Sequence, residues 1–498
     1  MAKEPGSDRT GPRRGFDTFR AGLAEEGRVR PRERRRRGSS TPERKRSDRP
    51  NVLWLMADQL RADTMGCMGH PSIQTPNMDR VAGEGAVFTN SFAGEPVCMP
   101  SRATFLTGHY PGIHGVLQNG IPMRESEVAF PTLLKEAGWR TANIGKSHCG
   151  RNSKDIWEYT EYVEDVFGAT KPSKVAFDPE VYPELTFIGN KVCDNSDRVL
   201  YGKYPGPPQT SKSYILASQA MMWLYWHDDP RPFFLRVSFD DPHPPVVPPE
   251  PYASMYGPDD VRPELLEGYE RSLATKPSVV REYREFTGMS EISEADHRMH
   301  AARYLGLVSH LDAQMGRIID YLDEIGVADN TIVIINSDHG HMIGEHGLSH
   351  KGPLCYEGTA RVPTIVRWPG RLEAGKRIDA LADGVDFMPT VLDMLDVDIP
   401  QDAHGHSLLP VLEGKEKKVR DYAFIEWDDF GFCIRGERWK LTWWDSDQDG
   451  ELYDLTEDPL EKNNLYHEPG VREVRDDLLQ RLNEWRGRYG PHRAVENE

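Results

Sequence analysis

The chain has 498 residues, which is enough to bury a large core, either in two to four domains or in one large domain with an appendage. Asp and Glu outnumber Lys and Arg by 79 to 61, so the net charge is −18. The first 50 residues carry +8 and the remaining 448 carry −26. This acidic body argues against DNA and other long polyanions as partners through general electrostatics.

The N-terminal segment differs in composition from the rest of the chain. Residues 1–49 are rich in Arg, Gly, Ser and Pro, which predicts a disordered basic tail. No apolar core of a secretory signal follows the basic residues, and no stretch approaches the ~20 apolar residues of a membrane span. Six widely spaced cysteines lack the pattern of a disulfide scaffold or a zinc site. We therefore expect a cytoplasmic protein that contacts neither nucleic acid nor a membrane.

From Asn51 onward, apolar runs alternate with amphipathic segments. Residues 51–57 form a short, continuously apolar run that is typical of a central parallel strand. Further strands are predicted at 86–92, 139–144, 232–239, 331–336 and 362–367, and helices at 75–85, 131–137, 213–227 and 296–325. This order predicts an α/β fold with a large, mostly parallel sheet and helices on both faces. Residues 151–214 have weak periodicity and are expected to form surface insertions around a pocket.

The pattern changes after Gly414. Four short strands are predicted at 422–427, 431–435, 439–444 and 450–455, followed by a helix at 471–489. They indicate a smaller C-terminal antiparallel sheet with one helix packed on it. The predicted organisation is a tail at 1–49, the main α/β domain at 50–414 and a small α+β subdomain at 415–498.

Polar side chains follow three of the predicted strands, at Asp58-Gln59, at Gly145-Lys146-Ser147-His148 and at Asp338-His339. An open α/β sheet binds its ligands at the carboxyl ends of its strands. The two carboxylates can therefore meet at one edge and, with Gln59 and His339, form a site for Ca²⁺, Mg²⁺ or Mn²⁺. Taken singly, an Asp at a strand end is as readily a helix N-cap or a turn residue.

A further motif, Cys98-Met99-Pro100-Ser101-Arg102, is followed by Leu106-Thr107-Gly108. It resembles the formylglycine-dependent (type I) sulfatases of the alkaline-phosphatase superfamily, whose modified residue lies in Cys-x-Pro-Ser-Arg before a Leu-Thr-Gly. The resemblance extends from about Asn51 to Tyr489. The other matching blocks are Asp58-Gln59, Gly145 to His148, Pro242-His243-Pro244-Pro245, Ser337 to Gly340, and Gly344 to Leu348 with Lys351-Gly352.

The resemblance implies that a formylglycine-generating maturation enzyme oxidises Cys98 to an aldehyde. The hydrate of this aldehyde would attack the sulfur of a sulfate monoester with the help of one divalent metal ion, for which Ca²⁺ is expected and Mn²⁺ or Mg²⁺ are alternatives. The implied metal ligands are Asp58, Gln59, Cys98, Asp338 and His339.

The remaining roles follow from charge, because sulfate transfer spreads negative charge over the equatorial oxygens and needs clustered cations. Arg102 would hold the hydrate and the metal ligands, and Lys146 and Lys351 would bind sulfate oxygens. His148 would be the base for collapse of the hemiacetal, and His243 the acid that protonates the leaving group. His346 lies in a matching motif and is expected just behind the site, whereas His109, His114, His341 and His350 are expected to be surface or packing residues.

Two positions depart from the usual sulfatase pattern, which often has Asp where this chain has Gln59 and Asn where it has His339. The same pairing occurs in the phosphonate monoester and phosphodiester hydrolases of this superfamily, which form the first alternative. Lys146 and His148 favour the sulfatase, because those hydrolases are expected to have uncharged residues there. A second alternative is a non-catalytic sulfate-binding relative in which Cys98 stays unmodified.

The substrate stays open at this stage. The expected substrate is a small-molecule or short saccharide sulfate ester, and a sulfated sugar, an alkyl or aryl sulfate and a choline-like ester all fit. The acidic body would repel a heavily sulfated polymer. A homo-oligomer is compatible with the sequence.

Overall fold

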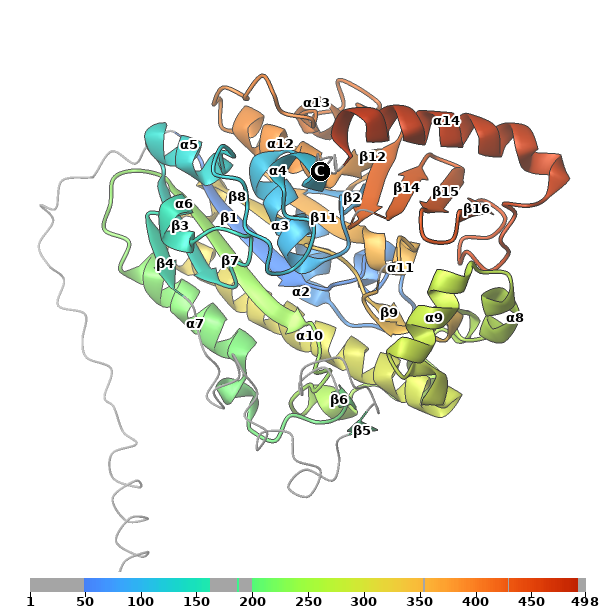
Figure 1. The fold of residues 1–498 in the computed structure, drawn as a ribbon. Coiled ribbons are helices and arrows are strands. Elements are labelled where there is room, and N and C mark those ends of the chain that lie inside the picture. The colour runs from blue at the N-terminus through green and yellow to red at the C-terminus, as the bar shows by residue number, and fades with distance from the viewer. Residues whose placement is uncertain (1–48, 162–185, 188–198, 353, 429, 491–498) are drawn as a thin grey trace, which may run out of the picture. The chain divides into compact units, whose positions relative to one another are not determined.

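The computed structural model describes residues 49–161, 186–187, 199–352, 354–428 and 430–490 (Figure 1). The predicted disordered tail therefore lies outside the described residues except for Arg49, whose guanidinium group lies over the ring of Trp139. Most of the predicted surface insertion between residues 151 and 214 also lies outside them. The compact unit that contains the described residues runs from 46 to 498.

An eight-stranded sheet confirms the predicted α/β fold. Its strands, in spatial order, are β12 (Lys376–Asp383), β2 (Ala86–Phe92), β11 (Arg361–Arg367), β8 (Thr331–Ser337), β1 (Asn51–Asp58), β7 (Phe233–Pro242), β3 (Arg140–Gly145) and β4 (Tyr159–Glu161). Every neighbouring pair is parallel except the two pairs that involve β11, which runs opposite to the rest. The sheet is thus mostly parallel, as expected.

Helices cover both faces of this sheet (Figure 1). One face carries α2 (Pro76–Glu84), α7 (Lys212–Tyr225) and α10 (Glu294–Glu324), and the other carries α3 (Cys98–Thr107), α4 (Pro111–His114), α5 (Phe130–Glu136), α12 (Phe387–Met394) and α13 (Leu409–Leu412). The shorter elements are α6 (Ser153–Ile156), α8 (Tyr269–Ala274), α9 (Ser278–Phe286) and α11 (Glu357–Ala360), with the small hairpins β5 (Thr186–Phe187) to β6 (Val199–Tyr201) and β9 (Met342–Ile343) to β10 (Ser349–His350).

The central strand β1 is buried on both faces. Leu53 and Leu55 point into the core beside α7 and α10, and Trp54 and Met56 point into the core on the opposite face. A strand buried in this way needs apolar residues at every position, which is why residues 51–57 form an unbroken apolar run.

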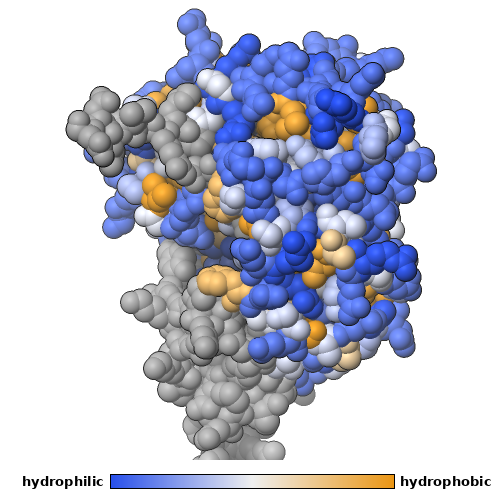
Figure 2. Space-filling view, turned by 45° about the vertical axis from the view of Figure 1, so that its right-hand side comes forward, coloured by the Kyte–Doolittle hydropathy of each residue, from blue (hydrophilic) through white to orange (hydrophobic). Residues whose placement is uncertain are grey.

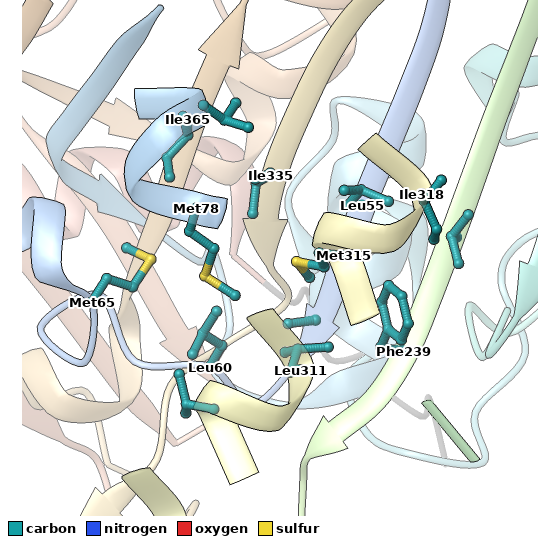
Figure 3. Packing of buried hydrophobic residues seen from close by; sticks show 14 of the residues in the cluster. Leu55, Leu60, Met65, Met78, Phe239, Leu311, Met315, Ile318, Ile335 and Ile365 are labelled. Carbon is teal, nitrogen blue, oxygen red and sulfur yellow. The ribbon is translucent and has the colours of Figure 1, made fainter. Parts of the chain in front are cut away.

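The longest helix, α10, fixes the position of one core. It begins after Ser293, whose hydroxyl oxygen accepts a hydrogen bond from the backbone N–H of Asp296. Its buried side chains Leu311 and Met315 pack in the same cluster as Leu55 of β1 (Figure 3). No helix among the described residues combines the length and the apolarity that a bilayer crossing requires.

The C-terminal part also forms as predicted. Strands β13 (Ala423–Trp427), β14 (Gly431–Arg435), β15 (Trp439–Trp444) and β16 (Asp449–Asp454) pair in sequence order as an antiparallel sheet, and α14 (Arg472–Tyr489) packs on it. The boundary proposed at residue 414 stays a prediction. On the face shown in Figure 2, the described surface is mostly hydrophilic and its hydrophobic residues form small separate patches.

Candidate active site

Two neighbouring strands deliver carboxylates to the same edge of the sheet. β1 ends at Asp58, and Asp338 follows β8, which pairs with β1 so that Ala57 lies opposite Ser337. Cys98 is the first residue of α3. Ligand atoms of Asp58, Cys98, Asp338 and His339 all lie within 4.8 Å of one another, and the four residues are buried. Residues as far apart in the sequence as Asp58 and His339 thus form one cluster.

Cys98 lies at the centre of this cluster. Its Sγ is 3.7 Å from Asp58 Oδ1, 3.3 Å from His339 Nε2 and 2.7 Å from Lys351 Nζ. His148 also shares a hydrogen bond with the thiol. Only 1% of Cys98 is exposed. The predicted nucleophile is therefore surrounded by the predicted metal ligands and cations.

Arg102 lies one helical turn beyond Cys98 and joins the two acids. Its Nε donates to Asp338 Oδ2 at 2.7 Å, and its Nη2 donates to Asp58 Oδ2 at 3.1 Å. Nη1 donates to Ser238 Oγ at 2.7 Å, so the guanidinium group is held on three sides. Because all of these side chains are buried, the ion pairs offset the cost of removing both carboxylates from water.

Charge in this cluster shifts the pKa values of its members. Burial by itself raises the pKa of Cys98, but Lys146, Lys351 and His339 outweigh it and hold the pKa well below the ordinary range. Burial also raises the pKa of Asp58, yet its contact with Lys146 and the charge of Arg102 leave that pKa lowered overall. The site therefore stabilises negative charge at both positions.

Both candidate proton-transfer histidines lie near the thiol: His148 shares a hydrogen bond with Cys98, and His243 contacts Lys351, which contacts Cys98 in turn. The Nδ1–H of His243 donates to the carbonyl oxygen of Pro244 at 2.7 Å, which leaves Nε2 toward Lys351 Nζ at 3.2 Å. Burial lowers the pKa of His148, so this histidine favours its neutral form. A neutral imidazole is a base, which suits the predicted role of His148.

The donor set fits a divalent cation. The Nδ1–H of His339 donates to the carbonyl oxygen of Gly340 at 2.9 Å, so the lone pair on Nε2 faces the cluster. Gln59 Oε1 is buried and has no hydrogen-bond partner among the described residues. This buried carbonyl oxygen, on the residue that follows Asp58, is a further oxygen that a hard cation could use together with the two carboxylates and the imidazole nitrogen.

Sequence reasoning missed several residues that hold this site. The Tyr283 hydroxyl donates to the carbonyl oxygen of Lys351 at 2.6 Å, and Ser238 contacts Arg102 from the middle of β7. His341 was expected to be a surface or packing residue, but it is buried and its Nδ1 accepts from Gln59 Nε2. A serine inside the apolar strand β7 was a usable signal, whereas nothing in the sequence marks Tyr283.

His346 contacts a different part of the molecule. Its Nδ1 shares a hydrogen bond with Ser272 Oγ at 3.0 Å, and its ring packs on Tyr356. The residues around His346 that match the family pattern therefore serve the packing of the loop that precedes Lys351.

Comparisons with known proteins agree with this geometry. The sulfatase family model matches residues 50–397, and the model for the C-terminal region of N-sulphoglucosamine sulphohydrolase matches residues 344–488. The arylsulfatase of Clostridium perfringens is 31% identical in an alignment of 459 positions that covers 87% of this chain and 93% of that protein. The N-acetylglucosamine-6-O-sulfatase of Bacteroides thetaiotaomicron is 28% identical in an alignment of 531 positions, gaps included, that covers 92% of this chain and 90% of the relative.

A solved structure is also similar along most of the chain. The phosphonate monoester hydrolase of Agrobacterium radiobacter superposes with a TM-score of 0.76 at 27% identity, covering 89% of this chain and 96% of the other. The fold is thus shared with a phosphonate monoester hydrolase, and the sequence is similar to those of named sulfatases. The family match extends over most of the chain, so the protein belongs to the sulfatase family of the alkaline-phosphatase superfamily and is a hydrolase of sulfate esters.

Proposed function

We propose that the protein cleaves a sulfate monoester to an alcohol and inorganic sulfate through a formylglycine hydrate derived from Cys98 and one bound divalent cation, most consistent with Ca²⁺. The main support is the position of Cys98 Sγ, which lies among two carboxylates, an imidazole and Lys351 at the strand ends. A cysteine that only packs in a core does not need three charged side chains around it, so these contacts indicate a chemical role for Cys98.

The residues of the site divide the chemistry between them. A bound cation would polarise the hydrate and a sulfate oxygen as a Lewis acid. One hydroxyl of the hydrate loses its proton to water and attacks sulfur in line, the bond from sulfur to the ester oxygen breaks, and Lys146 and Lys351 stabilise the charge on the equatorial oxygens. The Nδ1–H of His243 is held by the carbonyl oxygen of Pro244, so the protonated form of this ring would give the proton on its Nε2 to the departing alkoxide.

The second half of the reaction releases sulfate. His148, which lies against residue 98, takes the proton of the remaining hydroxyl. The carbon–oxygen bond to sulfate then breaks, sulfate leaves with the electron pair of that bond, and the aldehyde forms again. Water adds to the aldehyde and restores the hydrate.

The test of the proposal has two parts. The chain is produced together with a formylglycine-generating enzyme, and a peptide that contains residue 98 is weighed, where conversion of cysteine lowers the mass by about 18 Da. Sulfate release from an aryl sulfate is then followed on the same sample. A fully unmodified thiol with no turnover would favour the non-catalytic alternative and overturn the proposal.

A phosphonate or phosphodiester hydrolase is the second candidate, because the Agrobacterium structure superposes well and Gln59 takes the place of a second aspartate. Aryl sulfate and aryl phosphonate turnover on one matured sample separates the two. We expect a higher kcat/KM for the aryl sulfate than for the aryl phosphonate. Lys146 and His148, where the phosphonate hydrolases are expected to have uncharged residues, both lie in the site, at Asp58 and Cys98.

A short sulfated saccharide is the substrate class that the comparisons favour. The relative from Bacteroides thetaiotaomicron is named for N-acetylglucosamine-6-O-sulfate cleavage. Near the start of α3, the exposed Asn119 accepts from the backbone N–H of Met99, and its neighbour Gln118 donates to Asp428. These amide and carboxylate groups offer hydrogen-bond partners for sugar hydroxyls beside the nucleophile.

Divalent metal is expected to stabilise the fold. At a free Ca²⁺ concentration of about 100 times its Kd, binding should raise the free energy of unfolding by about 2.7 kcal/mol. Thermal unfolding with EDTA and then with Ca²⁺, Mn²⁺ or Mg²⁺ measures the effect. The Asp338→Asn variant is the control, since it keeps the shape of the side chain and removes a ligand charge; an equal shift in that variant would place the ion elsewhere.

His243 should matter most for substrates with poor leaving groups. His243→Ala is expected to lower kcat/KM for an alkyl sulfate by about 10²- to 10⁴-fold, because the alkoxide then leaves unprotonated. For 4-nitrophenyl sulfate, whose phenolate is a good leaving group, the loss should stay below roughly 10-fold. Sulfate release by ion chromatography checks both.

The matched control for this prediction is His346→Ala, which removes a buried histidine that contacts Ser272 instead. Its effect should be the same on both substrates. A loss in His243→Ala that does not depend on the leaving group would contradict the acid role.

A further inference from the structure

Gln59 is held in an unusual way for a candidate metal ligand. Its side chain is buried, its Nε2 donates to His341 Nδ1, and its Oε1 has no partner among the described residues. Its backbone has a positive φ of 70°, in the left-handed region. Because His341 accepts the hydrogen bond from Nε2 of Gln59, it determines the direction in which the amide oxygen of Gln59 points.

His341 continues into a second buried histidine. Its Nε2 lies 3.3 Å from Nε2 of His300, and its ring stacks on Tyr304 with a centroid distance of 4.9 Å and an interplanar angle of 7°. The Tyr304 hydroxyl in turn donates to the carbonyl oxygen of Gln59 at 2.7 Å. His300 and Tyr304 are one turn apart on α10, so a single helix supports both ends of the arrangement.

The positions of the hydrogens follow from this geometry. An amide nitrogen only donates, so Nδ1 of His341 has no hydrogen, and a neutral His341 must carry its hydrogen on Nε2. That hydrogen points to Nε2 of His300, which must be bare because two ring nitrogens this close share one hydrogen.

We propose that His341, backed by His300 and Tyr304, is a positioning residue that fixes the side-chain amide of Gln59 so that its oxygen faces the metal site. The inference rests on the cation site of the proposed function and extends it to residues that contact neither substrate nor metal. Without the acceptor at His341, the amide of Gln59 can rotate and present its N–H₂ group to a cation, which repels it. Fixing a ligand through a buried hydrogen bond is worth about 10- to 100-fold in metal affinity.

The test compares two substitutions of His341 in the full-length chain. His341→Phe keeps a ring against Tyr304 but accepts no hydrogen bond, whereas His341→Asn retains an oxygen acceptor close to the position of Nδ1. Calorimetric titration with Ca²⁺ and with Mn²⁺ measures the Kd of each protein. We expect the Kd to rise about 10- to 100-fold in His341→Phe and less than about 5-fold in His341→Asn.

A double-mutant cycle distinguishes positioning from general packing. In the Gln59→Ala background the metal has already lost the amide oxygen, so adding His341→Phe should change the Kd by less than about twofold. The same large loss in both backgrounds would overturn the inference, as would an unchanged Kd in His341→Phe. If His341→Phe does not fold, His300→Leu, which removes the acceptor for the Nε2–H of His341, takes its place in the cycle.

Two controls keep this inference separate from the proposed function. The unsubstituted chain should bind the cation, and Asp338→Asn should abolish binding. If the unsubstituted chain binds no divalent cation, the metal in the proposed function and the positioning role are both wrong. If it binds and His341→Phe binds equally well, only the positioning role is wrong.

Discussion

The Cys98→Ala variant is expected to have a kcat for sulfate esters at least ~10⁴-fold below that of the matured enzyme, because it lacks the proposed nucleophile. Lys146 and Lys351 remain in place, so the variant should still bind inorganic sulfate. The inhibition constant of sulfate against any residual activity should be similar to that of the matured enzyme. Sulfate release from an aryl sulfate, with thermal unfolding as a check of the fold, measures the loss.

Two further variants sharpen this result. Cys98→Ser supplies a single hydroxyl. The serine sulfate that it forms has no second hydroxyl to expel the sulfate, so each chain should cleave one sulfate ester and then stop. Cys149→Ala is the matched control, since it removes another buried cysteine whose Sγ lies 3.7 Å from Ser147 Oγ and which has no role in the proposed chemistry. Continued turnover by Cys98→Ala would show that the nucleophile lies elsewhere.

Replacing Arg102 should have the largest effect on stability. In Arg102→Met, a side chain of similar length without charge leaves Asp58 and Asp338 buried without their shared partner. Breaking a buried ion pair on one side typically costs about 3–5 kcal/mol in the free energy of unfolding. Urea unfolding followed by tryptophan fluorescence measures it, and added Ca²⁺ should recover part of the loss because a cation supplies positive charge beside the same carboxylates.

A distant ion pair provides the control for Arg102. Lys440 is buried and lies 2.8 Å from Glu461 Oε1. Lys440→Met should also destabilise the chain, but Ca²⁺ should recover no more stability in this variant than in the unsubstituted protein. An Arg102→Met variant with an unchanged free energy of unfolding would contradict the geometry of the site.

Much of the fold could be predicted because the buried strands consist mainly of apolar and β-branched residues. The central strands β1, β7 and β8 were recognised from this composition, although β7 also buries Arg236 and Ser238. β12 was missed because it lies at the sheet edge, where exposed and buried residues mix and Arg377 and Asp379 interrupt the apolar pattern. The reversed direction of β11 could not be read either, since a strand direction is set by the path of the connection and not by strand composition.

The site was predictable where its residues lie in short motifs at strand ends. Asp58, Asp338 and His339 meet because parallel neighbouring strands end together. His341 and Tyr283 escaped prediction because their contacts depend on how α9 and α10 pack beside the strand ends. Such contacts join segments far apart in the chain and have no periodic signature.

Under the proposed function, the burial of Cys98 would set a time limit on its oxidation. In the folded chain the thiol is enclosed, and a second enzyme cannot reach it without opening the strand ends around it. Lys351, which closes one side, is made 253 residues after Cys98. At the usual rate of protein synthesis this delay is roughly 10 to 50 s. The proposed maturation enzyme would thus compete with chain completion, and an abrupt increase in expression should lower the fraction of active molecules without altering their fold.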